Sequence, residues 1–248
     1  MRLLVKAVMC ALVTGAVALS VPTISVAQAR PPVAAGNVPG CLSGSQTDPG
    51  WYLRHLRATI LRVVVSPSYG QYGQALPCIA AARSEGYRTE LVVQWNSRWS
   101  LSRTKGFFRQ ILGEYRLYAW SVAIGNEQEI TPRLTGAAYS HDWRALEPIV
   151  RRMAPWAIRV GGEISPWGLG FLSGALRDGL PGIQAIAVHP YYYSWAFSPS
   201  QALRLAQRYG LPLWDDEGLY DGPGTWHPHQ ARSRAAMRGA ALIGTWLS

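Results

Sequence analysis

The chain has 248 residues, and its 24 lysines and arginines outnumber 14 aspartates and glutamates, which gives a formal net charge of +10. Such a charge suits an anionic partner such as nucleic acid or cell-wall polymer. The arginines are scattered through helix-like segments rather than clustered, which favours solvated helix faces and argues against a nucleic-acid-binding protein. The length is sufficient for one domain with a full core.

The N-terminus has the pattern of a signal peptide. Arg2 and Lys6 give a positive start, a mostly apolar and uncharged run extends from residue 7 to about residue 26, and Ala27-Gln28-Ala29 suits a cleavage site. We expect residues 1–29 to be removed and the rest to be secreted, into the extracellular space or a periplasm. A transmembrane anchor is the alternative, since the run is nearly long enough to span a bilayer. The later helical segments are too short or too charged for that, so no membrane association is expected after cleavage.

Two cysteines, Cys41 and Cys78, are left once the signal peptide is removed. An even pair in an exported chain indicates one disulfide bond, and two buried free thiols are the alternative. Neither cysteine has the local spacing of a zinc site. His227 and His229 flank a proline in an expected loop, so neither a metal nor any other cofactor is expected.

Apolar runs alternate with helix-like segments, and successive runs begin 26 to 39 residues apart. This rhythm is typical of βα units, in which each buried parallel strand is a short continuous apolar run. Pro148 is expected to kink or divide the helix in which it lies. Strands are predicted at residues 59–65, 89–95, 118–125, 157–162, 183–188, 211–215 and 241–246. Helices are predicted at residues 51–56, 74–85, 101–114, 135–153, 167–178, 200–209 and 229–239.

The alternation predicts an α/β protein with a single (β/α)8 TIM barrel at residues 50–248. Seven strands are visible, so the first strand of the barrel has to lie in residues 30–49, which are either an N-terminal extension or a degenerate strand. The candidate is residues 33–38, and it is weak because Gly36 and Asn37 lie inside it. A doubly wound open sheet is the structural alternative, but no glycine-rich phosphate fingerprint follows any strand.

Polar and aromatic residues gather directly after four predicted strands. Functional groups of a parallel barrel project from the C-terminal ends of its strands, so these clusters form the candidate site. The chain also has 11 tryptophans and 12 tyrosines, a density that fits sugar binding because flat rings stack on the C–H faces of pyranoses. The four clusters are Ala123-Ile124-Gly125-Asn126-Glu127-Gln128-Glu129, His189-Pro190-Tyr191-Tyr192-Tyr193, Asp215-Asp216-Glu217-Gly218 and Gly244-Thr245-Trp246.

Together these clusters resemble the clan A retaining glycoside hydrolases, which are (β/α)8 barrels. The resemblance covers roughly residues 50–248. In that clan one glutamate on strand 4 is the acid/base and another on strand 7 is the nucleophile, so it implies Glu127 and Glu217 as the catalytic residues. It rests on Gly125-Asn126-Glu127, His189-Pro190-Tyr191, Glu217-Gly218, Trp246 and, in the second strand, Arg62.

The chemistry requires different environments for the two carboxyls. One carboxyl protonates the departing glycosidic oxygen, and a second, about 5 to 5.5 Å away, attacks the anomeric carbon. Strands 4 and 7 lie on opposite sides of a narrow barrel mouth, so their tips can hold both groups. Glu127 has to be protonated, which burial or a nearby negative charge favours, whereas Glu217 has to be ionised, and Arg62 is a candidate cation for it.

Several further residues are expected to contact substrate. By the resemblance, Asn126 hydrogen-bonds the sugar 2-hydroxyl, and Tyr191 or His189 orients the nucleophile or binds substrate. Trp246 is expected to form the floor of the sugar subsite, with Trp95 as a further stacking surface. The alternative for Arg62, Trp95 and Trp246 is an ion pair or plain core packing.

Other carboxyls compete for the catalytic roles. Glu129 is expected to face solvent, while Glu163 ends the fifth strand and could line the cleft. Asp215 is the substitute for Glu217 as nucleophile, because strand alternation places both on one side. Two carboxyls on one side raise each other's pKa, which suits an ionised nucleophile poorly.

The sequence thus predicts a secreted, monomeric glycosidase that cleaves β-glycosidic bonds of a polysaccharide or oligosaccharide with retention. The alternative is a catalytically inactive TIM barrel that binds glycan or cell-wall polymer. The weak first strand, the short chain, the Asp215-Asp216 pair and the basic charge favour that alternative. A serine hydrolase is disfavoured because no Gly-x-Ser-x-Gly elbow is present.

Overall fold

A computed structural model describes residues 35–37, 41, 48–56, 58–67, 75–130, 134–189 and 199–215. The expected signal peptide, the last predicted helix and the last predicted strand lie outside these described residues. Within the described ranges, no helix is both long and apolar enough to cross a membrane.

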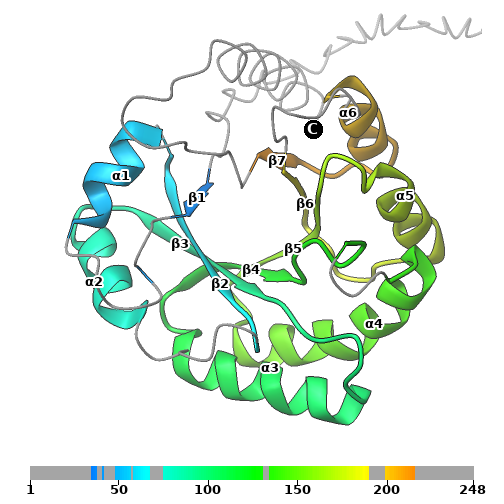
Figure 1. The fold of residues 1–248 in the computed structure, drawn as a ribbon, viewed down its shortest axis with the longest axis horizontal. Helices are drawn as coiled ribbons and strands as arrows, with labels where there is room; N and C mark the ends of the chain where they lie inside the picture. Colours follow the sequence, from blue (N-terminus) through cyan, green and yellow to red (C-terminus); the bar gives the residue numbers. More distant parts are fainter. Residues whose placement is uncertain are drawn as a thin grey trace, which may run out of the picture.

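Seven parallel strands form one sheet and pair in the order in which they occur along the chain. Figure 1 shows the sheet curving round, with the last described strand near the first. The sequential order means that each strand pairs with the strands of its neighbouring βα units. The strands are β1 (Ala35–Asn37), β2 (Ile60–Val65), β3 (Arg88–Val93), β4 (Ala119–Ile124), β5 (Ile158–Ile164), β6 (Ala185–Val188) and β7 (Leu213–Asp215).

Helices alternate with the strands and surround the sheet on its outer side (Figure 1). Two of them begin at side-chain caps: Ser100 Oγ accepts the Arg103 N–H, and Thr135 Oγ1 accepts the Ala138 N–H. Such caps satisfy N–H groups that have no partner within the helix. The helices are α1 (Pro49–Leu56), α2 (Leu76–Ser84), α3 (Leu101–Tyr115), α4 (Gly136–Met153), α5 (Leu169–Asp178) and α6 (Pro199–Arg208).

The predicted elements correspond closely to the observed ones, and the α/β class is confirmed. The weak first strand exists: β1 pairs in parallel with β2, with Ala35 opposite Ile60. The expected division at Pro148 is wrong, because α4 runs as one helix from Gly136 to Met153 with the proline inside it. Its large buried face packs against the neighbouring elements and offsets the missing backbone hydrogen bond. The buried face consists of Tyr139, Ser140, Trp143, Leu146, Glu147, Ile149 and Val150.

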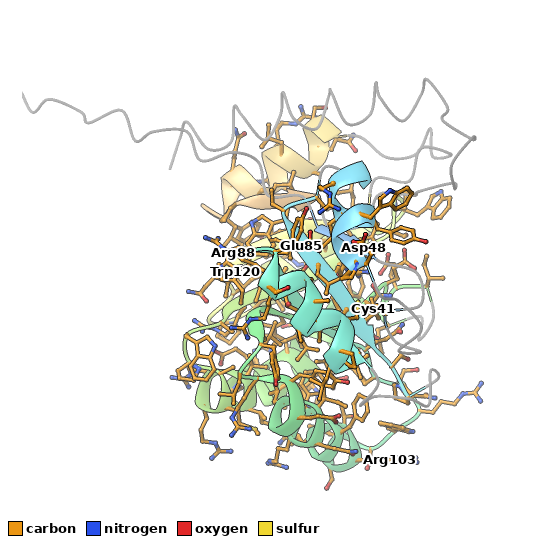
Figure 2. All side chains as sticks on the ribbon, turned by 90° about the vertical axis from the view of Figure 1, so that its left-hand side faces the viewer. Cys41, Asp48, Glu85, Arg88, Arg103 and Trp120 are labelled. Atoms are coloured by element: carbon orange, nitrogen blue, oxygen red, sulfur yellow. A yellow bond between two sulfur atoms is a disulfide. The ribbon has the colours of Figure 1, made fainter. Side chains whose placement is uncertain are left out.

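The sheet separates two apolar clusters. The larger one fills the space between the strands and the helices, and the smaller one contains Val92, Ala123 and Val160 inside the barrel. Near the N-terminal ends of the strands, Trp120 stacks on Trp214 with ring centroids 5.4 Å apart. The guanidinium of Arg88 lies 4.7 Å from the Trp120 ring, and Figure 2 shows these two side chains together. Aromatic packing therefore occupies that end of the interior, and the polar groups lie toward the opposite end.

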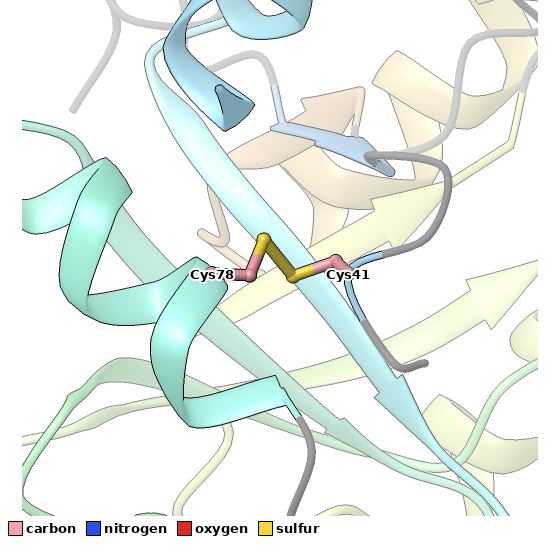
Figure 3. Close-up of a disulfide and its surroundings, with 2 residues drawn as sticks. All are labelled: Cys41 and Cys78. Atoms are coloured by element: carbon pink, nitrogen blue, oxygen red, sulfur yellow. A yellow bond between two sulfur atoms is a disulfide. The ribbon is translucent and has the colours of Figure 1, made fainter. Parts of the chain in front are cut away.

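A disulfide bond joins Cys41 to Cys78, as the even pair of cysteines predicted. Figure 3 shows it linking the chain that follows β1 to helix α2. Both cysteines are buried. The bond thus holds the short first strand close to the second βα unit.

Replacing both Cys41 and Cys78 with serine should lower the free energy of unfolding by about 2–4 kcal/mol, because the bond closes a long loop and restricts the unfolded chain. The two cysteines are 37 residues apart. Urea unfolding of the oxidised protein and of the double variant measures the difference. A reductant should destabilise the native protein and leave the variant unchanged; an equal response of both would contradict the assignment.

Candidate active site

Glu127 lies on the sharp turn that follows β4. Gly125 has φ 102° and Glu127 has φ 44°, a left-handed conformation that is uncommon for residues other than glycine and tends to occur at functional sites. The Glu127 N–H donates to the carbonyl oxygen of Glu163 at 2.7 Å, and the Glu127 carbonyl accepts the N–H of Ile130. The backbone is fixed from both sides, while the side chain stays 18% exposed.

His189 directly follows β6, and its side chain is fully buried. Its backbone N–H donates to the carbonyl of Ile164 at 2.8 Å. Its ring lies between two carboxyls: Nδ1 is 3.1 Å from Glu127 Oε1, and Nε2 is 3.3 Å from Glu163 Oε2. The structure thus brings together two of the strand-end residues that the sequence singled out, Glu127 and His189.

Arg62 extends from β2 into the same cluster and is buried. Its Nη2 lies 2.5 Å from Asn126 Oδ1 and 2.6 Å from Glu163 Oε2. The sequence suggested Arg62 as a cation for Glu217, which lies outside the described residues; within the described part of the chain, Glu163 is an ion-pair partner of Arg62. Because the guanidinium only donates, it fixes the amide of Asn126 with its oxygen toward Arg62 and leaves Nδ2 as the side that can donate to a ligand.

The side chain of Glu163 lies deeper in the barrel than expected. The sequence suggested that it could line the cleft, but its side chain has no exposed surface. It is therefore an internal partner of Arg62 and His189 and is not accessible to substrate.

Glu90 lies in β3, opposite Arg62 in the register between β2 and β3. It is fully buried, and its Oε1 accepts a hydrogen bond from Ser121 Oγ at 3.4 Å. Burial, together with the nearby carboxylate of Glu163, raises the pKa of Glu90 to about 8 against the opposing effects of Arg62, Ser121 and His189. At neutral pH the Glu90 carboxyl is thus mostly protonated, which limits the negative charge inside the barrel.

The raised pKa of Glu90 predicts a pH-dependent stability. Between the ordinary value of 4.5 and about 8, the folded state holds a proton that the unfolded state has lost, so this group's contribution to stability falls as pH rises through that window. Glu90→Gln removes the titration. We expect the variant to gain stability relative to the native protein between pH 5 and pH 9, as measured by urea unfolding at both values. If the free energies of unfolding of the variant and the native protein differ by the same amount at both pH values, the raised pKa of Glu90 is contradicted.

Glu129 does not face solvent as expected. It is half-buried, and its Oε1 accepts the N–H of Ser165 at 2.7 Å. Burial raises the pKa of Glu129. Its carboxyl therefore joins the loop after β4 to the loop after β5.

Trp95, expected as a stacking surface for substrate, is only 3% exposed. Its ring stacks on Tyr139 at a centroid distance of 6.1 Å and meets Phe108 edge-on at 5.9 Å. The packing alternative holds for this residue, which lies on the helix-facing side of the sheet. Trp167, by contrast, is 64% exposed on the loop after β5 and was not singled out from the sequence.

Three predicted site residues, Tyr191, Glu217 and Trp246, lie outside the described residues, and of Asp215 only the backbone is described. The distance between the two expected catalytic carboxyls therefore stays a prediction. Among the residues that the structure describes, no group of three or more histidine, cysteine, aspartate or glutamate side chains is arranged to hold a metal ion.

Comparisons with solved structures identify the fold. The catalytic domain of an endoglucanase from Thermobifida fusca matches with a TM-score of 0.60 and 16% identity over 85% of this chain and 76% of that one. The catalytic domain of a mannanase from Streptomyces sp. SirexAA-E matches with a TM-score of 0.60 and 18% identity over 86% and 73% of the two chains. A GH53 catalytic domain from Ignisphaera aggregans matches with a TM-score of 0.54 and 15% identity over 88% of this chain and 77% of that one.

No protein-family model matches the sequence, and a search of curated proteins finds no significant match. At these identities, the structural similarity defines the fold alone. The chain is an α/β protein with the (β/α)8 architecture, as predicted, and it shares this architecture with glycoside hydrolases of the kind that the sequence resembles.

Proposed function

We propose that this protein is a retaining glycoside hydrolase in which Glu127 is the acid/base and Glu217 the nucleophile. The observation that carries the proposal is the position of Glu127. Its carboxyl is partly exposed at the C-terminal end of β4, in contact with buried His189, and it follows Asn126, whose amide is fixed by Arg62. This is the end of the barrel at which enzymes of this fold place their chemistry.

The proposed reaction uses two carboxyls in two steps. Glu127 donates its proton to the departing glycosidic oxygen while the Glu217 carboxylate attacks the anomeric carbon, which gives a covalent glycosyl ester. Glu127, now ionised, takes a proton from water as the water attacks the ester and releases the sugar. The Nδ2 of Asn126 can donate to the 2-hydroxyl, a contact that strengthens as the ring approaches the oxocarbenium-like transition state.

The proposed substrate is a β-linked polysaccharide or oligosaccharide. Two solved structures that share the fold are called an endoglucanase and a mannanase, which supports β-glucan and β-mannan as the first substrates to test. We also propose that the protein is exported and acts as a monomer, and the disulfide bond is consistent with export into an oxidising compartment.

Turnover of a substrate panel tests the proposal. The panel comprises 2,4-dinitrophenyl β-glycosides of several sugars together with soluble β-glucan and β-mannan, assayed by release of dinitrophenol or of reducing ends. Retention requires that the first product formed has the anomeric configuration of the substrate, which NMR of fresh reaction mixtures measures. Binding of a glycan without any turnover would favour the inactive, glycan-binding barrel instead.

Trp167 is proposed as a stacking surface for a distant sugar of a long substrate. Its exposed indole follows the strand adjacent to β4 and provides a flat apolar surface of the kind that sugars stack on. Trp167→Ala should raise KM for polysaccharide by about fivefold to tenfold, as expected for the loss of one aromatic contact of 1–1.5 kcal/mol. KM for a single-sugar aryl glycoside should stay unchanged. An equal rise for both substrates would exclude a role at a remote subsite.

A further inference from the structure

The two-carboxyl mechanism leaves Glu163 without a role, although the structure places it at the centre of the cluster. Among the described residues, Glu127 and Glu163 are the two non-glycine residues with positive φ, at 44° and 47°. A left-handed glutamate that is also completely buried is costly on two counts, since both the backbone conformation and the buried charge need compensation.

A bulge in β5 explains how Glu163 reaches the interior. Gly162 pairs with Ala187 and Ile164 pairs with Val188, so one extra residue is accommodated between two consecutive pairs. Val160 belongs to the cluster inside the barrel, whereas Ile164 packs on the helix-facing side. Regular alternation would place both on the same side, and the bulge reverses this, as bulges near active sites often do.

Glu163 contacts the acid/base residue in two ways. Its backbone carbonyl accepts the N–H of Glu127 at 2.7 Å. Its carboxylate lies 2.6 Å from Arg62 Nη2 and 3.3 Å from His189 Nε2, and the other ring nitrogen of His189 lies 3.1 Å from the Glu127 carboxyl. A continuous path therefore runs from the Glu163 carboxylate through the imidazole to Glu127.

The charges along this path define the state of the imidazole. Arg62 Nη2 lies 3.3 Å from Nε2, but its two N–H groups already donate to Asn126 Oδ1 and Glu163 Oε2 at shorter distances. Nε2 therefore carries a proton and donates it to the Glu163 carboxylate at 3.3 Å. In neutral imidazole, Nδ1 is then an acceptor directed at Glu127. An acceptor at this place pairs with the protonated carboxyl of Glu127, which is the form that a general acid needs. Among the described residues, Glu90 is a further ionisable group near His189, and it is mostly neutral at pH 7.

We propose that Glu163 is a positioning residue that holds His189 in the Nε2–H tautomer, so that Nδ1 cannot donate to the Glu127 carboxylate and Glu127 keeps the proton that it later gives to the leaving group. This inference rests on the proposed function. The proton passes from Glu127 to the glycosidic oxygen and returns to Glu127 from water, while His189 stays neutral and Glu163 stays ionised throughout. Glu163 itself touches no substrate.

The test is Glu163→Gln, which keeps the shape and lets the new amide donate to Nε2, so that the ring proton moves to Nδ1. We expect kcat/KM to fall by about tenfold or more for glycosides with alkyl or sugar leaving groups, which need an acid, and to stay within about twofold for 2,4-dinitrophenyl glycosides, which do not. The high-pH limb of kcat/KM should also shift to lower pH. Equal loss for both leaving groups would assign Glu163 a structural role only and overturn the proposal.

Glu147→Gln is the matched control. Glu147 is also buried and paired with an arginine, with its Oε1 3.3 Å from Arg159 Nε, but it lies on α4 on the outer side of the sheet. This variant should keep the native ratio of kcat/KM values for the two kinds of leaving group. If it changes the ratio as Glu163→Gln does, the effect comes from the loss of any buried ion pair and the proposal fails.

A second measurement needs neither activity nor a folded Glu163 variant. In the ¹⁵N-histidine NMR spectrum of the native protein, we expect the His189 ring to have a protonated Nε2 and an unprotonated Nδ1, with its signals identified by their loss in His189→Gln. A proton on Nδ1 overturns the inference.

If the tautomer is as expected but the native enzyme cleaves no glycoside, the proposed function fails and the role of Glu163 in acid catalysis fails with it. If the native enzyme is active and the leaving-group ratio is unaffected, only the role of Glu163 fails.

Discussion

Replacing Glu217 with glycine should lower kcat for an activated aryl β-glycoside by about 10⁴-fold or more, because removal of a nucleophile eliminates the covalent route. Azide should restore turnover by occupying the space left by the carboxylate. The product expected from Glu217→Gly is a glycosyl azide with the anomeric configuration opposite to that of the substrate, since azide attacks once from the nucleophile's side. NMR of the isolated product measures the configuration.

The corresponding variant at the acid/base has a different signature. Glu127→Ala should lower kcat/KM by about 10²–10⁴-fold for glycosides with poor leaving groups. With an activated substrate, azide should yield the glycosyl azide of retained configuration, because it intercepts the covalent intermediate.

Asp215→Gly separates the two candidate nucleophiles. If that variant, and not Glu217→Gly, loses activity and regains it with azide, Asp215 is the nucleophile and the assignment of Glu217 is wrong.

Replacing Arg62 with methionine should lower the free energy of unfolding by about 3–5 kcal/mol, because it leaves the buried carboxylate of Glu163 without its cation. Both side chains of this pair have no exposed surface, and their atoms lie 2.6 Å apart. Urea unfolding near neutral pH measures the loss. A change within experimental error would show that the Glu163 carboxyl is neutral and that the ion pair is not formed.

Two further variants test whether the loss of stability in Arg62→Met comes from the unpaired charge of Glu163. Arg62→Met combined with Glu163→Gln should recover part of the lost stability, since the buried negative charge is removed with its partner. Arg54→Met should have little effect on stability, because Arg54 forms exposed ion pairs with Asp48 and Glu85, the two acidic residues labelled in Figure 2. The contrast attributes the loss in the first variant to burial of the charge.

Most of the barrel could be predicted because its strands and helices differ in periodicity. Even the three-residue β1 lies inside the weak candidate at residues 33–38. The helix is not divided at Pro148 because the propensity of a single residue acts locally, whereas the large buried face of α4 acts over its whole length. The order of the strands followed from the sequential βα rhythm, which places each strand beside the next.

The candidate site was predicted in part. Asn126, Glu127 and His189 come together because each directly follows a parallel strand, and strand ends meet at one end of a barrel. Trp95 could have been assigned to the core from alternation, since it has the same parity as Leu91 and Val93, which pack toward the helices.

The partners of Arg62 could not have been predicted in the same way. The sequence predicted a strand that ends at residue 162, with Glu163 following it as a residue that could line the cleft, and it named no partner for Arg62 in this segment. The bulge that turns it inward depends on the pairing with β6, which no local pattern records. The ion pair between Arg62 and Glu163 thus depends on one additional residue in β5, and the sequence pattern does not reveal it.

Because of this bulge, a single residue of β5 provides the internal negative charge and takes no part in the regular pairing of β5 with β6. Without residue 163, Gly162 and Ile164 would follow each other in regular alternation, and Ile164 would still face the helices opposite Val188. A chain shortened by that one residue would keep the regular pairing of β5 with β6, but it would lose the anion beside Arg62 and His189 and the carbonyl that accepts the Glu127 N–H, so Arg62 would need another partner. Along a lineage of such proteins, insertion or loss of this position would change the charge inside the barrel without a new fold, which makes strand length here a marker to compare among homologues.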